Sequence, residues 1–370
     1  MRLGIDLQSA VDDLRGMGRV VRSLLAQFLQ DYPQHEYFLF AKNESQIPAV
    51  ENLISAWASP KTVLHILALP ELRSTMLDAC WYPWNRLDLK PKTGRAFVTI
   101  HDMARFAFPY KEWLRWWDQR KDEKQYHQAA RLADRILTIS QFSASEIEKH
   151  LHVPAAQIAV IYNGIDTSLF SANPAAEADA VLPPPFQKPY LLFVGADSGA
   201  KNLPTLLEAF ALLKRTYKKP ISLICWGSGE ACRQRHQNIL QAGGIADSVL
   251  FPELQSDDTL LRQLYQQAEL FVFPSIYEGF GLPPLEAMAA GAPVVCSRFA
   301  SMPEVVGDAA LYFDAKSPAN MAETISSMLE NEALRQEYSH RGSEHVRQFT
   351  WAKAAQQYMK IFEGSGVDSW

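Results

Sequence analysis

One short segment of the chain gathers residue types that can bind a polar ligand. Residues 274–288 read PSIYEGFGLPPLEAM, with acids at Glu278 and Glu286. A carboxylate accepts two hydrogen bonds, which suits a pair of neighbouring hydroxyls on a sugar ring or a ribose. Gly279 and Gly281 would let backbone amides approach a ligand closely. The segment therefore predicts a loop that binds a hydroxylated ligand.

The sequence around these acids predicts a strand, the loop and then a helix. The apolar run Leu270–Phe273 precedes the loop, and Pro284 stands near the first position of a helix that runs to Ala290. The positive end of that helix favours a phosphate. Taken alone, Glu286 could complement the helix dipole from the first turn, and Glu278 could be a solvated loop residue. The combination of glycines, prolines and acids favours ligand binding.

The two glutamates and the Gly-Phe-Gly-Leu-Pro sequence between them resemble the signature of retaining glycosyltransferases of family 4. This resemblance implies the GT-B fold, an α/β architecture of two Rossmann-like domains whose parallel sheets face each other across a cleft. It further implies that Glu278 contacts the donor sugar and Glu286 the ribose of the nucleotide. The donor-binding residues implied in this segment are Glu278, Gly279, Phe280, Gly281, Leu282 and Glu286.

A second segment resembles the diphosphate-binding loop of the same family. Val194-Gly195 is followed by Lys201-Asn202-Leu203, and the ammonium of Lys201 would donate strongly to a leaving diphosphate. A solvated lysine is the alternative interpretation. The family usually places an arginine directly before this lysine, whereas this chain has Ala200. We expect Arg298 to supply the missing cation, so that Gly195, Lys201 and Arg298 complete the donor site in this half.

The first half of the chain offers His101 and two glycines. His101 follows the strand Ala96–Ile100, and a side chain at the carboxyl end of a parallel strand is well placed for ligand contact. A lone histidine is more often structural, but the family resemblance implies that His101 lies near the donor sugar and the acceptor. Asp102 is expected to orient the loop or the imidazole. Gly16 and Gly18, within RGMGR at 15–19, resemble the glycine-rich first loop of the family and are expected near the diphosphate or the acceptor.

Strand-like and helix-like segments alternate in both halves, which predicts parallel sheets covered by helices. With 370 residues the chain exceeds what one core usually supports. We expect an acceptor domain at 1–170, a linker at 171–189 and a nucleotide-sugar domain at 190–350. A last helix at 351–370 is expected to cross back to the first domain.

Composition excludes some classes of protein. The net charge of −5 gives no global electrostatic reason to bind nucleic acid. No secretory leader is visible, and no apolar run reaches the about 20 residues that span a bilayer. We therefore expect a cytoplasmic protein, with peripheral contact at the inner face of the membrane as a further option. The scattered cysteines, Cys80, Cys225, Cys232 and Cys296, are interpreted as buried free thiols rather than a zinc site.

The aromatic residues of the first half leave two interpretations open. They either pack in the core, or they line an acceptor site or rest at a membrane interface, where tryptophan is favoured. The group comprises Trp81, Tyr82, Trp84, Trp113, Trp116 and Trp117.

The predicted function is transfer of a hexose from a nucleoside-diphosphate sugar to an acceptor hydroxyl with retention, in polysaccharide or glycoconjugate synthesis. No Asp-x-Asp sequence occurs, so we expect no metal and no other cofactor, with Lys201 and backbone dipoles neutralising the diphosphate. The first loop resembles that of family members that use GDP-mannose, so the resemblance favours GDP-mannose as donor, with UDP-glucose next. The acceptor can be a saccharide, a lipid-linked saccharide or a small molecule.

Several alternatives remain at this stage. Ala200 is compatible with a degraded transferase that binds a ligand without turnover, and a small-molecule glucosyltransferase, an epimerase or a phosphorylase would share the fold. A nicotinamide oxidoreductase is disfavoured, because Val21 stands where the third glycine of the dinucleotide-binding motif belongs and no acid ends the strand near Phe40-Ala41.

Overall fold

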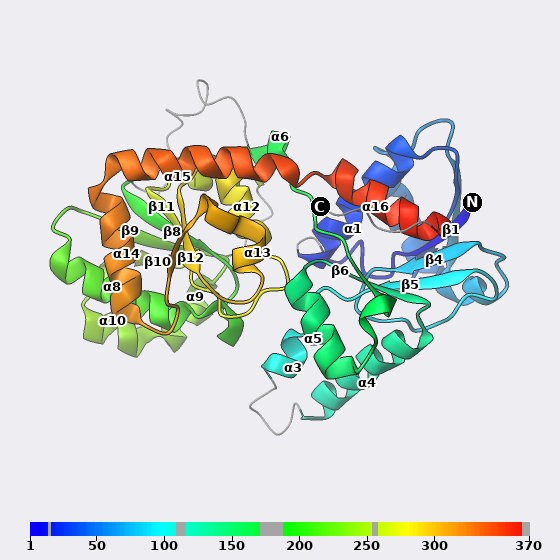
Figure 1. Cartoon of the computed structure of the whole chain (residues 1–370), viewed down its shortest axis with the longest axis horizontal. Coiled ribbons are helices and arrows are strands. Elements are labelled where there is room, and N and C mark those ends of the chain that lie inside the picture. The colour runs from blue at the N-terminus through cyan, green and yellow to red at the C-terminus, as the bar shows by residue number, and fades with distance from the viewer. Residues whose placement is uncertain (14–15, 109–115, 171–187, 254–257, 365–370) are drawn as a thin grey trace. The chain divides into compact units, whose positions relative to one another are not determined.

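The chain forms two compact α/β units. The computed structural model describes residues 1–13, 16–108, 116–170, 188–253 and 258–364, without the side chains of 116–119. The first unit comprises Met1–Gly164 and Phe349–Trp370, and the second comprises Ile165–Gln348 (Figure 1). The division therefore falls before the expected linker, of which residues 171–187 lie outside the described part. Each unit has one parallel sheet, as expected for two Rossmann-like domains.

The first sheet has seven parallel strands in the order β3-β2-β1-β4-β5-β6-β7. Its strands are β1 Arg2–Asp6, β2 Glu36–Ala41, β3 Val63–Ala68, β4 Ala79–Tyr82, β5 Arg95–Thr99, β6 Arg135–Thr138 and β7 Ile158–Val160.

The second sheet has six parallel strands in the order β10-β9-β8-β11-β12-β13. Its strands are β8 Tyr190–Val194, β9 Ser222–Trp226, β10 Val249–Leu250, β11 Leu270–Phe273, β12 Val294–Ser297 and β13 Leu311–Phe313. Every residue of β8 and β11 is buried, which explains their unbroken apolar sequences.

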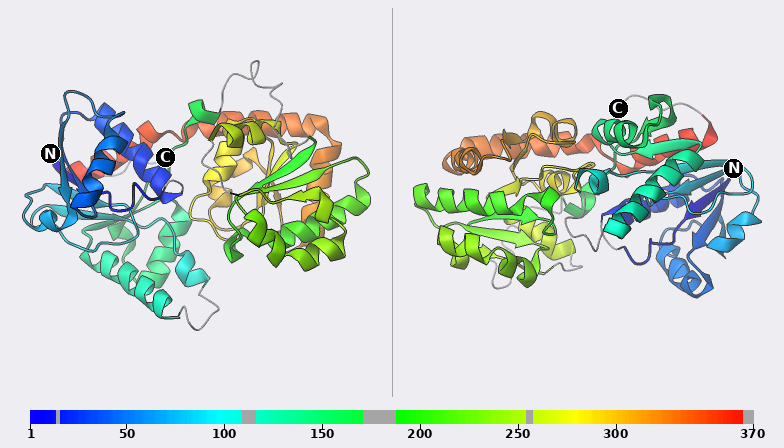
Figure 2. Two further views of the ribbon diagram at one scale, coloured as in Figure 1. Left: turned by 180° about the vertical axis from the view of Figure 1, so that it is seen from behind. Right: turned by 90° about the horizontal axis from the view of Figure 1, so that it is seen from below.

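Helices cover both faces of each sheet (Figure 2). In the first unit these are α1 Met17–Asp31, α2 Ile47–Ile54, α3 Ala104–Ala107, α4 Trp116–Leu132, α5 Gln141–Leu151 and α16 Trp351–Glu363. In the second they are α6 Thr167–Phe170, α8 Leu203–Thr216, α9 Gly229–Arg235, α10 Gln237–Gly243, α11 Asp258–Gln267, α12 Leu282–Ala289, α13 Met302–Val306, α14 Pro318–Glu330 and α15 Glu332–His345. Among the helices described, none is both long and apolar enough to cross a membrane.

The aromatic group of the first half contributes to the core. Trp81, Tyr82 and Trp84 are buried, and the first two lie in β4, a strand that the sequence patterns missed. The indole of Trp81 donates to Thr99 Oγ1 at 2.8 Å, and that of Trp84 donates to the carbonyl of Asp6 at 2.9 Å. The acceptor-site and membrane interpretations are therefore wrong for these three residues. Trp113 and the side chains of Trp116 and Trp117 lie outside the described residues.

The last helix, α16, packs in the first unit. The ring of Phe362 lies 5.1 Å from that of Phe97 and 6.2 Å from that of Phe28, measured between centroids. The hydroxyl of Tyr358 lies 3.3 Å from Thr99 Oγ1, and Arg95 donates to the carbonyl of Phe362. These contacts attach the C-terminal helix to the sheet that carries β5.

Helix α5 begins earlier than its sequence indicates. Ser140, not Ser143, is the N-cap, because its extended backbone allows Ser140 Oγ to accept the N–H of Ser143 at 3.0 Å. Ser143 and Glu146, whose spacing is also typical of a capping box, therefore lie inside the helix.

Candidate functional site

Two loops of the second unit are joined where adjacent strands end. Residues 195–202 follow β8 and residues 274–281 follow β11, and these strands are parallel neighbours. The N–H of Ile276 donates to the carbonyl of Ala200 at 2.8 Å. The side-chain amide of Asn202 donates to the carbonyls of Pro274 at 3.2 Å and Ala315 at 2.8 Å. The two loops are therefore held together by hydrogen bonds at the carboxyl edge of the sheet.

An ion pair connects the same two loops. Lys201 Nζ lies 2.6 Å from Glu278 Oε1, and the side chains are 22% and 14% exposed. The ammonium also lies 5.0 Å from the centroid of the Phe273 ring. The pair is therefore largely shielded but still reachable from solvent. A ligand that carries both phosphate and hydroxyl groups could take the place of this ion pair. Its phosphate would bind Lys201, and its hydroxyls would bind Glu278.

The backbone after Glu278 is held in a fixed shape. Ser301 Oγ lies 3.0 Å from the carbonyl oxygens of both Glu278 and Phe280, to which it can donate. Gly281 has φ of 96°, and a Cβ there would stand 2.3 Å from Met302 Cε. The left-handed conformation favours glycine, whereas the methionine end could move to admit a Cβ. The predicted ligand residues Gly279, Phe280 and Gly281 are buried along this loop, and Leu282 is half-buried at its end.

Gly281 is the N-cap of α12, and Glu286 lies in the second turn of that helix rather than the first. The helix begins at Leu282, two positions before the expected Pro284, because Gly281 already turns the chain into it. Glu286 is 5% exposed, and the hydroxyl of Tyr265 donates to its Oε2 at 3.0 Å. A buried carboxylate is costly without such a donor, so a dipole effect at the helix surface does not account for it. Tyr265, from α11, orients the acid and was missed by the sequence patterns.

Gly195 and Arg298 occupy different surroundings. A Cβ on Gly195 would stand 3.4 Å from Lys201 Cδ, so this glycine lies beside the lysine. Its carbonyl accepts a hydrogen bond from Ser228 Oγ at 3.0 Å. Arg298 is exposed, and its guanidinium lies 4.8 Å from the centroid of the Tyr312 ring. A role of Arg298 beside Lys201 stays a prediction.

In the first unit, His101 follows β5 and is 4% exposed. Its Nε2 lies 2.8 Å from the carbonyl oxygen of Pro83. A carbonyl only accepts, so Nε2 carries the proton and Nδ1 carries a lone pair. Burial lowers the pKa of His101 to about 4, so the ring is neutral at neutral pH. Asp102 Oδ1 accepts the N–H of Ala104 at 2.9 Å, which fits the expected loop-orienting role.

The glycine-rich turn lies near His101 in the same unit. Gly16 has φ of 56° and is the N-cap of α1, while the N–H of Gly18 donates to Asp13 Oδ2 at 3.0 Å. A Cβ on Gly18 would overlap the carbonyl oxygen of Asp13, only 1.7 Å away. Asn85 connects the turn to His101. Its Oδ1 accepts the backbone N–H of His101 at 2.7 Å, and its Nδ2 donates to Met17 Sδ at 3.5 Å.

Both halves of the chain match family models. The model for glycosyl transferases group 1 matches residues 175–345, and that for glycosyltransferase family 4 matches residues 14–169. O-antigen chain mannosyltransferase B of Escherichia coli is 30% identical over 380 residues, covering 95% of this chain and 96% of that protein. The serotype-specific mannosyltransferase WbdA of Escherichia coli is 28% identical over 227 residues, covering 60% of this chain and 28% of that protein.

Solved structures share the fold. Anabaena HepE in complex with UDP and glucose aligns with a TM-score of 0.75 and 16% identity, over 98% of this chain and 100% of that chain. Sucrose-phosphate synthase from Thermosynechococcus elongatus aligns with a TM-score of 0.72 and 18% identity, over 98% of both chains.

The lowered pKa of His101 predicts a pH-dependent stability. Between its ordinary pKa of 6.5 and the folded value of about 4, the unfolded chain binds a proton that the folded chain does not. Stability should therefore fall as pH falls through this window. We expect the free energy of unfolding of the wild type, measured in urea, to fall by up to about 3 kcal/mol more than that of His101→Gln between pH 6.5 and 4.

Two comparisons isolate this effect. Asp6, whose pKa burial raises to about 6, contributes with the opposite sign but is present in both proteins. The control variant His340→Gln replaces an exposed histidine of α15 and should have the wild-type free energy of unfolding at neutral pH. A stability difference between wild type and His101→Gln that does not change with pH would contradict the prediction.

Proposed function

The chain belongs to the family 4 glycosyltransferases, and from that premise we propose that it transfers mannose from GDP-mannose to a saccharide hydroxyl with retention at the anomeric carbon. The identity to O-antigen chain mannosyltransferase B over nearly the whole chain supports mannose as the sugar. It likewise supports an acceptor that is a growing polysaccharide. Transfer of glucose from UDP-glucose is the competing specificity.

The observation that carries this proposal is the Lys201–Glu278 pair beside the start of α12. A nucleoside-diphosphate sugar has an anionic diphosphate next to a ring of hydroxyls. When such a donor binds, Lys201 exchanges the carboxylate for the diphosphate, and Glu278 exchanges the ammonium for sugar hydroxyls. In such a donor the diphosphate is bonded to the anomeric carbon of the sugar, so one ligand presents both groups to neighbouring side chains.

Each remaining residue receives a role consistent with its surroundings. Glu286, oriented by Tyr265, accepts hydrogen bonds from the ribose hydroxyls. The amides around Phe280 and Gly281 face the sugar or the phosphates. His101, neutral and protonated on Nε2, offers Nδ1 as an acceptor for a hydroxyl of the sugar.

The proposed reaction is a displacement on one face of the sugar. The bond from the anomeric carbon to the phosphate oxygen breaks, and the acceptor oxygen bonds to the same face of that carbon. The acceptor proton passes to the leaving phosphate oxygen, and GDP departs. Lys201 and the amide dipoles at the start of α12 stabilise the charge on the diphosphate. The step requires neither an enzymic nucleophile nor a divalent ion at the diphosphate.

Calorimetry with nucleotides tests the donor assignment. GDP and GDP-mannose should bind, and UDP, ADP and UDP-glucose should bind more weakly. Glu286→Ala should weaken GDP binding by about 10–100-fold, because it removes hydrogen bonds to a charged acceptor. Tyr265→Phe keeps the carboxylate and should cost less than Glu286→Ala. Unchanged GDP affinity in Glu286→Ala would refute its ribose-binding role, and preference for UDP-glucose would refute the mannose assignment.

Loss of Lys201 should slow the chemical step. Lys201→Ala removes one preorganised cation from the developing charge, and we expect kcat to fall about 10²–10³-fold in a GDP-release assay. The exposed Lys219→Ala serves as the matched control and should retain wild-type kcat. Added Mg²⁺ or Mn²⁺ should leave the wild-type rate unchanged.

Two results would oppose this assignment. A Lys201→Ala enzyme with wild-type kcat would remove the lysine from the mechanism. A wild-type chain that binds GDP-mannose but releases no GDP with any mannose-terminated acceptor would favour the non-catalytic alternative that Ala200 raises.

A further inference from the structure

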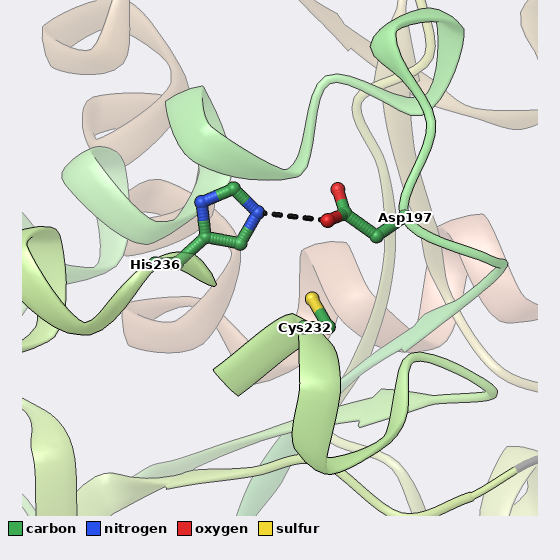
Figure 3. A group of neighbouring side chains, drawn as sticks. All are labelled: Asp197, Cys232 and His236. Atoms are coloured by element: carbon green, nitrogen blue, oxygen red, sulfur yellow. Dashed lines mark hydrogen bonds and ion pairs between the residues drawn. The ribbon is translucent and has the colours of Figure 1, made fainter. Parts of the chain in front are cut away.

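Three side chains of different chemistry meet beside the loop that carries Lys201. Asp197 comes from the β8–α8 loop, Cys232 from α9, and His236 from the residue that ends α9 (Figure 3). A carboxylate oxygen, the thiol sulfur and an imidazole nitrogen all lie within 4.8 Å of one another. No step of the proposed transfer uses these residues.

The three ligand atoms point at a common position. His236 Nε2 lies 3.1 Å from Asp197 Oδ2, and the thiol of Cys232 lies close to both groups (Figure 3). Cys232 and His236 are four residues apart, which places them on one side of the helix end. Cys232 is 1% exposed, and the side chains of His236 and Asp197 are 10% and 11% exposed. The cluster is therefore enclosed by protein.

We propose that Asp197, Cys232 and His236 bind a zinc ion. Sulfur, imidazole nitrogen and carboxylate oxygen are the ligands that zinc prefers, and three protein ligands leave the fourth position to water. Tetrahedral zinc with ordinary bond lengths places its ligand atoms about 3.3–3.8 Å apart. The three ligand atoms, now within 4.8 Å of one another, would reach these separations after a small movement of the side chains. The four cysteines are buried free thiols, as the sequence predicted, and the proposal gives one of them, Cys232, a ligand role.

The surrounding groups can serve as outer partners of the metal. Arg235 forms an ion pair with Asp197, and its side chain is 60% exposed. Solvent screens that guanidinium, so it can hold the carboxylate from outside without excluding the ion. Zinc binds cysteine as the thiolate, so zinc binding at Cys232 releases the thiol proton to solvent.

A bound metal would link the loop at residues 195–202, which contains Lys201, to helix α9. Asp197 lies between Gly195 and Lys201, and both other ligands belong to the segment that follows β9. A bound ion would tie the start of the 195–202 loop to α9 and stabilise the folded second unit by mass action. The competing account is an ion-pair network of Asp197, Arg235 and His236 that binds no metal.

Metal analysis of the full chain tests the proposal. Untagged protein is stripped with a chelator, dialysed against Zn²⁺ and analysed by mass spectrometry of the metal, with no nucleotide sugar present. We expect about one zinc per chain, and a cobalt-substituted sample should show the near-ultraviolet absorption of a thiolate–cobalt bond. Because no donor is used, the result is independent of the proposed transferase reaction.

Single substitutions identify the ligands. Cys232→Ser and His236→Gln should each weaken zinc at least about 100-fold, and Cys232→Ser should abolish the thiolate–cobalt absorption. Cys296→Ala removes another buried thiol of the same unit and should keep both signals. Circular dichroism identifies any variant that does not fold. If one ligand variant does not fold, the zinc content of the other ligand variant tests the proposal. A wild type without zinc, or folded ligand variants that retain it, would overturn the proposal.

Discussion

The ion pair between Lys201 and Glu278 is the interaction on which the candidate donor site depends. It joins a cation from one loop to a carboxylate from another, at a separation of 2.6 Å in a largely shielded position. A shielded pair is stable only when its geometry is good and its surroundings are fixed. The hydrogen bonds from Ile276 to Ala200 and from Asn202 to Pro274 supply that fixation. The parallel adjacency of β8 and β11 makes these contacts reachable.

The same constraint explains the unusual backbone around the pair. The chain must turn sharply after Glu278 so that α12 begins beside the carboxylate. Gly281 makes this turn in a left-handed conformation against Met302, and Ser301 is placed to hold two carbonyls of the loop. The turn leads from Glu278 directly into α12, and α12 carries Glu286 to Tyr265. The ion pair, the turn at Gly281 and helix α12 are therefore structurally connected within the second unit.

The sequence was sufficient for the fold class, because the fold class depends on local patterns. Continuous apolar strands alternating with amphipathic helices predicted the parallel sheets, and the spacing of Glu278 and Glu286 predicted the ligand loop. What failed depends on distant contacts. Trp81 looked available for an acceptor or a membrane, but Thr99 and the last helix enclose it. Tyr265 carried no local signal, because its role depends on a carboxylate in another helix.

The stereochemistry of the first product is the decisive test of retaining mannosyl transfer. GDP-mannose and a mannose-terminated oligosaccharide are incubated with the wild-type chain, and the new anomeric signal is followed by NMR. We expect an α-linked mannose, with the configuration of the donor, and release of GDP. A β-linked product, or consumption of UDP-glucose in preference to GDP-mannose, would contradict this expectation.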